Sequence, residues 1–210
     1  MGLKIALPKG RLGEKTYEIL KKKGYVCKEL EEDSRKLIFY NKELDLEYFL
    51  VKPSDVPTYV ERGSADIGIV GKDTLMEEEA NVYELLDLGF GKCKFAIAAP
   101  VGYVENPDET LIVATKYVNV AKNYFEKKER KIDIVKLNGS VELGPLVKLS
   151  DVIIDLVETG NTLRENNLEV IEEIGDISAR LIANKSSFKF KREAIEELVE
   201  KVREEIKWKL

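Results

Sequence analysis

The sequence predicts an α/β fold. Short apolar runs alternate with amphipathic helical patterns along all 210 residues, which is the signature of this fold class. Apolar residues make up 44% of the chain, enough to build a substantial core. Glycine follows several of the apolar or helical segments, as at Gly10, Gly24 and Gly63, and marks their ends.

The first half of the chain begins with a strand over 3–7 and a helix that has Leu12, Thr16 and Ile19 on one face and ends at Gly24. Ser54 is a suitable N-cap for a helix over 55–62, and a second helix starts after Gly71 and runs through 76. The other strands expected here are 26–30, 36–40, 46–51, 65–70 and 84–88.

Gly89 and Gly91 flank a crossover into a second unit. Its expected strands are 95–99, 111–114, 132–137, 152–156, 168–174 and 178–183. Helices are expected over 118–127, over 140–149 with Ser140 as the N-cap, and over 191–208. The last of these has Ile195, Leu198, Val199, Val202 and Ile206 on one face, which predicts packing against the first domain.

Composition excludes several classes of function. The net charge of −5 argues against nucleic-acid binding, and no apolar run is long enough for a membrane span, so we expect a cytoplasmic protein. The chain has no histidine, which removes imidazole bases and Ser-His-Asp sites. Its two cysteines, Cys27 and Cys93, form no metal-spaced pair. Carboxylate, lysine, hydroxyl and oxygen-bound magnesium chemistry remain.

The most informative segment is DVIIDLVETGNTL, residues 151–163. A buried strand ends there in the acidic residues Asp155 and Glu158 and continues into a loop of hydroxyl and glycine residues, Thr159, Gly160, Asn161 and Thr162. Backbone amides and hydroxyls of such a loop can hold a sugar phosphate, and the carboxylates can accept hydrogen bonds from ribose hydroxyls. The alternative is a tight turn without a ligand.

Other polar clusters also follow predicted strands. Lys9 and Arg11 flank Gly10 and form a candidate phosphate clamp or a solvated turn. Asp66 lies in an apolar run and needs either a structural partner or a ligand, while Gly68 leaves room for another backbone or a nucleotide base. The remaining candidates at strand ends are Gly71, Lys72, Lys94, Thr115, Lys116 and Glu142. Open α/β sheets bind ligands at the carboxyl ends of their strands, so this shared placement favours a polyanionic ligand with ribose hydroxyls.

These segments, taken in order, resemble the catalytic subunit of the ATP phosphoribosyltransferase family. Enzymes of this family catalyse the first step of histidine biosynthesis. The resemblance rests on ALPKGRL, VKPSDVPTYVERGSADIGIVGKD, LGFGKCKFAIAAP, IVATKY, LNGSVELGP and DVIIDLVETGNTLRENNL, and it extends over nearly the whole chain. It implies two α/β domains of the periplasmic-binding-protein type (type II) with the active site in the interdomain cleft. Domain I would comprise 1–88 with 184–210, and domain II 89–183.

The chain length resembles the short form of the family. Such chains are implied to form homodimers and to join a regulatory subunit resembling histidyl-tRNA synthetase in a hetero-octamer. The implied reaction is attack of adenine N1 of ATP on the anomeric carbon of phosphoribosyl pyrophosphate (PRPP), with release of pyrophosphate. Adenine N1 already carries a lone pair, so no strong base is required.

The resemblance also implies roles for the candidate residues. Lys9, Arg11 and Asp155 are the expected catalytic residues. PRPP would be bound by Asp155, Glu158, Thr159, Gly160, Asn161 and Thr162. ATP would be bound by Arg11, Asp66, Gly71, Lys72, Lys94, Thr115, Lys116 and Glu142. Mg²⁺ is expected as cofactor, held through the substrate phosphates.

Two other functions fit parts of the pattern. The same fold serves solute-binding proteins, so a binding module for a small anion is the first alternative. Phosphoribosyltransferases of purine salvage also place acidic residues before a threonine-glycine phosphate loop. In this chain that loop comes late, after a complete earlier unit.

Overall fold

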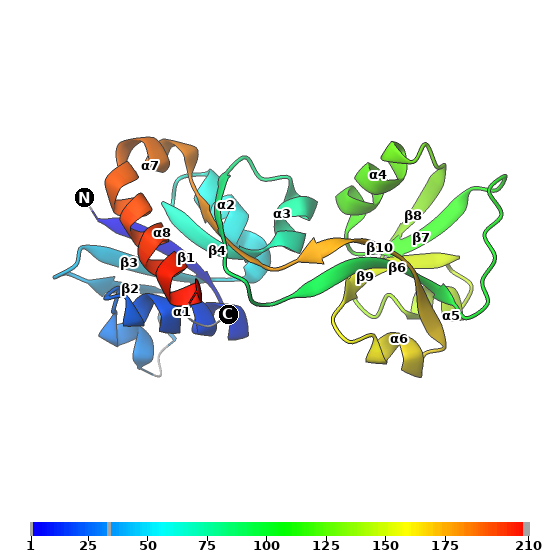
Figure 1. Ribbon diagram of the computed structural model, residues 1–210, viewed down its shortest axis with the longest axis horizontal. Coiled ribbons are helices and arrows are strands. Elements are labelled where there is room, and N and C mark those ends of the chain that lie inside the picture. The colour runs from blue at the N-terminus through cyan, green and yellow to red at the C-terminus, as the bar shows by residue number, and fades with distance from the viewer. Residues whose placement is uncertain (1, 33–34, 208–210) are drawn as a thin grey trace. The chain divides into compact units, whose positions relative to one another are not determined.

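The computed structural model describes residues 2–32 and 35–207 and divides the chain into two compact units. The first unit comprises Met1–Gly91 and Ser178–Leu210, and the second is the continuous segment Lys92–Ile177. Each unit is built around one mixed β-sheet with helices on it (Figure 1). The α/β fold expected from the alternating pattern is therefore present in both units.

The first sheet has the order β2-β3-β1-β4-β11-β5. Its central strand β1 (Leu3–Pro8) runs parallel to β3 (Leu46–Val51) and to β4 (Ile67–Gly71). The hairpin strand β2 (Ile38–Asn41) forms one edge and β5 (Tyr83–Asp87) the other. Because β1 and β4 are parallel, Pro8 and Gly71 both lie at the carboxyl end of this sheet.

The strand β11 (Ala179–Ala183) corrects the expected domain boundary. Residues 178–183 were assigned to the second domain, but β11 is hydrogen-bonded antiparallel to both β4 and β5 in the first sheet. The chain therefore returns to the first unit at Ser178. Both faces of β11 are buried, with Leu181 and Ile182 fully covered, so apolar sequence alone did not identify the sheet it joins.

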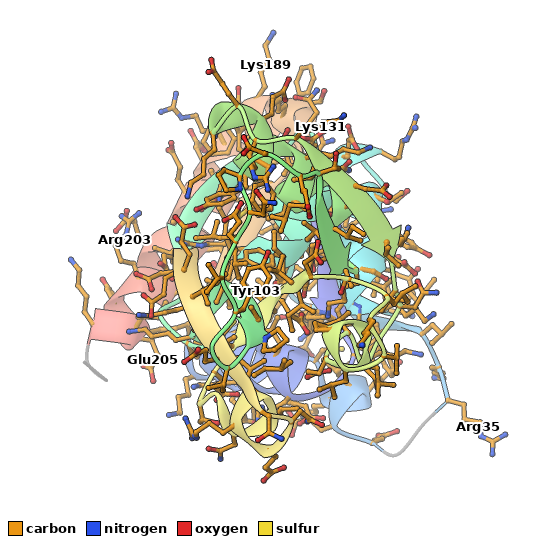
Figure 2. All side chains as sticks on the ribbon, turned by 90° about the vertical axis from the view of Figure 1, so that its right-hand side faces the viewer. Arg35, Tyr103, Lys131, Lys189, Arg203 and Glu205 are labelled. Carbon is orange, nitrogen blue, oxygen red and sulfur yellow. The ribbon has the colours of Figure 1, made fainter. Side chains whose placement is uncertain are left out.

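The helices of the first unit cover its sheet. Helix α1 (Arg11–Lys22) and the C-terminal helix α8 (Arg192–Lys207) bury their apolar faces in one core, as the spacing of Ile195, Leu198 and Val202 predicted. Charged residues fill the other faces of α8, and Figure 2 shows Arg203 extending outward from it. The remaining helices of this unit are α2 (Val56–Glu61), α3 (Lys72–Glu78) and α7 (Lys185–Phe190), with short 3₁₀ turns η1 (Lys28–Glu31) and η2 (Pro53–Asp55).

The second sheet has the order β10-β6-β9-β7-β8. Strand β9 (Val152–Val157) lies at its centre, antiparallel to β6 (Cys93–Pro100) and parallel to β7 (Leu111–Thr115). The edges are β8 (Ile132–Lys136) and β10 (Leu168–Ile177). Helices α4 (Val118–Lys127), α5 (Leu143–Leu146) and α6 (Asn161–Glu165) belong to this unit.

Three local predictions were wrong. Residues 26–30 form no strand, because the chain turns into η1 directly after Cys27. The Tyr17 hydroxyl accepts a hydrogen bond from the Cys27 amide at this turn. Ser54 lies inside η2, and its hydroxyl bonds Asp55 rather than a helix amide. The helix expected over 140–149 is reduced to α5, because Ser140 and Lys148 adopt positive φ angles of 47° and 57° that are incompatible with a helix.

In the part of the chain that the structure describes, no helix is long and apolar enough to cross a membrane.

Candidate active site

A pocket of about 240 Å³ lies at the carboxyl end of β9. Its floor is formed by Ala96 and Ala98 of β6 beside Ile153 and Asp155 of β9, and the register pairs Ala96 with Asp155. Alanine at these positions leaves open space above the sheet where a larger side chain would fill it. The pocket is therefore a consequence of two small residues next to the strand that carries the carboxylate.

The loop Glu158–Thr162 forms the rim of this pocket. Gly160 adopts a left-handed conformation with φ of 71°, which turns the chain from β9 into α6. The hydroxyl of Thr159 accepts the Asn161 amide at 3.4 Å, and Leu163 is buried below the loop and fastens it to the core. The segment expected to hold the PRPP phosphate is thus a compact loop directly over a pocket.

Three carboxylates line the same pocket: Asp155, Glu158 and Glu142. Asp155 is half-buried, and its Oδ1 accepts the Leu156 amide at 2.8 Å, which fixes its orientation. Glu142 reaches the pocket because its neighbour Val141 is buried against Ala98, Ile153 and Leu163. The sequence interpretation placed Glu142 among ATP ligands, whereas the structure brings it together with the predicted PRPP residues.

The ends of the neighbouring strands meet at the same edge of this sheet. The parallel register of β7 and β9 places Ala114 beside Ile153, and Leu137 after β8 donates its amide to the Thr115 carbonyl at 3.0 Å. Antiparallel β6 begins at this edge, since Lys94 pairs with Val157. Segments that are far apart in sequence therefore converge around the loop after β9, as the shared placement at strand ends predicted.

The candidates on β6 and β7 differ in what their side chains do. Thr115 is completely buried: its hydroxyl donates to the Ile154 carbonyl at 2.7 Å and accepts the Tyr117 amide at 2.9 Å. Both interactions are structural, and they remove Thr115 from the set of plausible ATP ligands. Lys116 is exposed with its ammonium 4.6 Å from the centre of the Tyr117 ring. Lys94 lies 2.6 Å from Glu173, a hydrogen bond that raises the pKa of the lysine.

A second pocket, of about 320 Å³, lies in the first unit at the carboxyl end of β1. Lys9 lines it, together with Gly10 and the buried Tyr17. Arg11, the first residue of α1, is exposed and does not line this pocket. The turn between β1 and α1 therefore brings Lys9 to a cavity but leaves Arg11 on the surface beside it.

Gly71 and Lys72 lie at the neighbouring strand end, where β4 passes into α3. A Cβ on Gly71 would meet Oδ1 of Asp73 at 2.1 Å, so the Asp73 side chain folds over the glycine. The ammonium of Lys72 is paired with Glu84, which also lies 3.4 Å from Nε of Arg180. Lys72 thus begins a charged network rather than standing alone.

Asp66 lies at the opposite end of the first sheet from these residues. It precedes β4, is 4% exposed, and its Oδ2 accepts the Lys4 amide at 2.8 Å and the Lys191 ammonium at 2.7 Å. These contacts supply the structural partners that a buried carboxylate needs, so Asp66 requires no ligand. The expectation that Asp66 shares one site with Lys9 and Lys72 is corrected accordingly, because those two residues lie at the other end of the strands.

Three basic residues near the pockets were missed by sequence reasoning. Arg164 bonds Asn161 beside the loop after β9, and Arg35 and Lys36 line the pocket that contains Lys9. Figure 2 shows Arg35 extending outward from its segment. The sequence did contain an indication of Arg164, because it lies one turn after Gly160. A basic residue in a short helix, however, is ordinarily interpreted as a solvated surface side chain.

The donor set suits magnesium only together with a substrate. Within residues 2–32 and 35–207, no group of three or more acidic or cysteine side chains is arranged to hold a metal ion. Mg²⁺ commonly binds through one or two carboxylates plus substrate phosphates. Asp155 and Glu158, beside the loop predicted to bind phosphate, meet that requirement.

Comparison with known proteins gives one family. The family model described as HisG: ATP phosphoribosyltransferase matches residues 52–204. The chain is 59% identical over 203 residues to "ATP phosphoribosyltransferase" of Brachyspira hyodysenteriae, covering 96% of this chain and 98% of that protein. It is 56% identical over 198 residues to the protein of the same name from Clostridioides difficile, covering 94% and 95%.

A solved structure is similar over the same extent. It is the "ATP phosphoribosyl transferase (HisG:HisZ) complex from Thermotoga maritima", to which this chain is 40% identical with a TM-score of 0.86, covering 98% of each chain. Sequence and fold are thus similar to those relatives from end to end.

Proposed function

The chain belongs to the ATP phosphoribosyltransferase family, and we propose that the pocket after β9 holds the ribose 5-phosphate portion of PRPP. The family's reaction is the first step of histidine biosynthesis. The observation that carries the proposal is the combination in one pocket of a left-handed glycine loop, two threonine hydroxyls and three carboxylates. A sugar phosphate presents the complementary groups: an anion at one end and hydroxyl donors at the other.

In this arrangement the phosphate faces the backbone amides of the loop and the hydroxyls of Thr159 and Thr162. Asp155 and Glu158, with Glu142, accept hydrogen bonds from the ribose hydroxyls. Each contact between a hydroxyl and a carboxylate is charge-assisted and worth about 1.5 to 3 kcal/mol. These contacts orient the anomeric carbon toward the incoming base.

Catalysis then depends on positioning and on charge stabilisation. Adenine N1 attacks the anomeric carbon, the bond to pyrophosphate breaks, and the electron pair of that bond leaves with the pyrophosphate oxygen. Lys9 and Arg11 are proposed to neutralise the charge that develops on pyrophosphate. No residue has to remove a proton from the nucleophile, which agrees with a chain that lacks histidine.

The ATP side of the proposal retains Arg11, Gly71, Lys72, Lys94 and Lys116. Asp66 and Thr115 are omitted because their polar atoms are committed to structural contacts. Lys72 and Lys94 each have an acidic partner, Glu84 and Glu173, so each would exchange that partner for a phosphate oxygen. Such an exchange keeps the ammonium paired in both states.

We propose that Mg²⁺ binds through the substrate phosphates with Asp155 or Glu158 completing its coordination. When bound, the ion neutralises phosphate charge and so assists departure of pyrophosphate. The periplasmic-binding-protein-like (type II) arrangement of the two units, with the active site in an interdomain cleft, stays a prediction. So do the homodimer and the cytoplasmic location.

A regulatory partner is part of the same proposal. The similar Thermotoga maritima structure is a complex of HisG with HisZ, and its catalytic chain is covered over 98% of its length by this chain. We propose that this chain likewise assembles with a HisZ-like subunit. The predicted hetero-octamer is the stoichiometry to test by mass measurement of the mixed subunits.

The function is tested by pyrophosphate release from ATP and PRPP, measured on the chain alone and after addition of a HisZ-like subunit. We expect release that requires both substrates. A solute-binding module would bind one small anion without releasing pyrophosphate. An enzyme of the purine-salvage type would accept a free purine base in place of ATP, so adenine is the matched control substrate.

A further inference from the structure

The charged side chains that line the pocket after β9 are all acidic. Its lining residues, all within the described part of the chain, include the carboxylates of Glu142, Asp155 and Glu158 and no basic side chain. A phosphate monoester brings about 1.5 to 2 further negative charges at pH 7. Backbone amides supply dipoles, and the proposed Mg²⁺ assists the departing pyrophosphate, so the 5′-phosphate beside three carboxylates still calls for a cation of its own.

Arg164 is placed to supply that cation. It lies in α6, and its Nη2 donates to Oδ1 of Asn161, one of the lining residues. Its Nη1 lies 3.3 Å from the position that a Cβ on Gly160 would occupy. The guanidinium therefore stands directly beside the two loop residues at the point where the chain turns over the pocket.

The guanidinium has donors to spare for a ligand. Arginine carries five N–H donors in a planar fork, and the contact with Asn161 uses one of them. Arg164 can thus keep its contact with Asn161 and present a second edge to a phosphate. Its amide donates to the Gly160 carbonyl at 3.1 Å, so side chain and backbone move with the loop as a unit.

Two other cations of this sheet edge have contacts elsewhere. Lys94 is paired with Glu173 at 2.6 Å, and Lys116 lies 4.6 Å from the centre of the Tyr117 ring. Neither residue lines the pocket. Arg164, by contrast, contacts a residue that does.

We propose that Arg164 is a phosphate-binding residue of the PRPP site, whose guanidinium pairs with the 5′-phosphate while it holds Asn161 in place. This inference rests on the proposed function, since it takes the pocket to be the ribose 5-phosphate site. Under this proposal, Arg164 increases the affinity of the site for PRPP and makes the site prefer phosphorylated ribose to free ribose.

The test uses two substitutions that separate charge from hydrogen bonding. Arg164→Lys keeps the positive charge, whereas Arg164→Gln keeps a donor for Asn161 but removes the charge. Arg192→Gln is the matched control, because Arg192 is an exposed arginine of α8 that is paired along its helix with Glu196. The measurements are the KM for PRPP, the KM for ATP, the Tm, and calorimetric titration with ribose 5-phosphate.

We expect Arg164→Gln to raise the KM for PRPP and the Kd for ribose 5-phosphate about 10-fold to 100-fold, with little change in the KM for ATP. Arg164→Lys should recover a large part of this loss, and Arg192→Gln should resemble the wild type. Equal affinity of wild type and Arg164→Gln for ribose 5-phosphate would overturn the proposal. So would a glutamine variant that performs as well as the lysine variant, since a purely structural contact with Asn161 needs no charge.

The titration keeps this inference separate from the proposed function. Wild-type chain that binds ribose 5-phosphate through Arg164 but releases no pyrophosphate, even with a HisZ-like subunit added, would refute the enzymatic proposal and support the binding role. Pyrophosphate release that is unaffected by Arg164→Gln would support the enzymatic proposal and refute the binding role of Arg164. Absence of any ribose 5-phosphate binding by the wild type would refute the role of Arg164.

Discussion

The ammonium of Lys191 lies 2.7 Å from Oδ2 of Asp66, across 125 residues of sequence. The pair joins the segment before α8 to the start of β4, and Asp66 also accepts the Lys4 amide at 2.8 Å. Only 5% of the Asp66 side chain and 18% of the Lys191 side chain is exposed, so the two charges are paired in a partly dehydrated environment. A residue first considered as a nucleotide ligand instead fastens the C-terminal segment to the first sheet.

Asp66→Asn should therefore lower the free energy of unfolding without changing substrate binding. Removing the negative charge leaves the Lys191 ammonium without its charged partner, although the Gly2 carbonyl still accepts a hydrogen bond from it, at a cost of about 2 to 4 kcal/mol. Urea unfolding gives the stability, and the KM for ATP gives the binding. A raised KM for ATP with unchanged stability would return Asp66 to the nucleotide site.

Two threonines at the same sheet edge should respond differently to loss of the hydroxyl. Thr162→Ala is expected to raise the KM for PRPP by about 30-fold, corresponding to about 2 kcal/mol, and to leave the KM for ATP nearly unchanged. Thr115→Val should mainly lower the Tm, because its buried hydroxyl bonds the Ile154 carbonyl and the Tyr117 amide. Equal effects of Thr162→Ala on both KM values would contradict the phosphate-loop assignment.

Gly68→Ala should be destabilising through steric contact. A Cβ on Gly68 would lie 2.6 Å from Val60 Cγ2 and 2.7 Å from Val56 Cγ1, because α2 packs directly on this point of β4. The sequence analysis expected room beside Gly68 for another backbone or a nucleotide base, but helix α2 occupies that position. Forcing α2 away should cost about 1 to 3 kcal/mol, measurable by urea unfolding, with Gly139→Ala as a control at a site with open space.

Alkaline pH should weaken the first unit through Tyr17. Its hydroxyl donates to the Cys27 carbonyl and accepts the Cys27 amide, both at 2.9 Å, and burial raises its pKa to about 12. An unfolded tyrosine titrates near pH 10, so the stabilisation is complete below that pH and is lost as the pH rises from about 10 to 12. Tyr17→Phe should be less stable at pH 8, and its deficit relative to wild type should shrink above pH 10. A constant difference in Tm between pH 8 and 11 would contradict this.

Removal of divalent metal should abolish turnover. Because Asp155 and Glu158 offer only part of a coordination shell, Mg²⁺ has to enter with the substrate phosphates. Excess chelator should stop pyrophosphate release, and added Mg²⁺ should restore it, while the Tm of the substrate-free protein stays unchanged. Turnover that persists in chelator would rule out metal-assisted departure.

Much of the site was accessible from the sequence because its parts are close together in the chain. Asp155, Glu158 and Thr159–Thr162 span a strand and the turn after it, and the apolar run and the glycine define both. The loop amides and these carboxylates are therefore neighbours through chain connectivity, although the pocket beneath them also requires Ala96 and Ala98 of β6. Lys9 could be located in the same way, as the first residue after an apolar strand.

Sequence alone thus determined the α/β class, most of the strands and the glycine-containing loop after β9, since periodicity and turn residues act over a few positions. Only the tertiary structure decided that Asp66 pairs with Lys191, that Thr115 is internal, that Glu142 joins the loop pocket and that β11 enters the first sheet. The physical reason is that a buried polar atom is satisfied by whichever group the packing brings within 3 Å or so. In Asp66, Thr115 and β11 that group comes from a distant part of the chain, which no local pattern specifies.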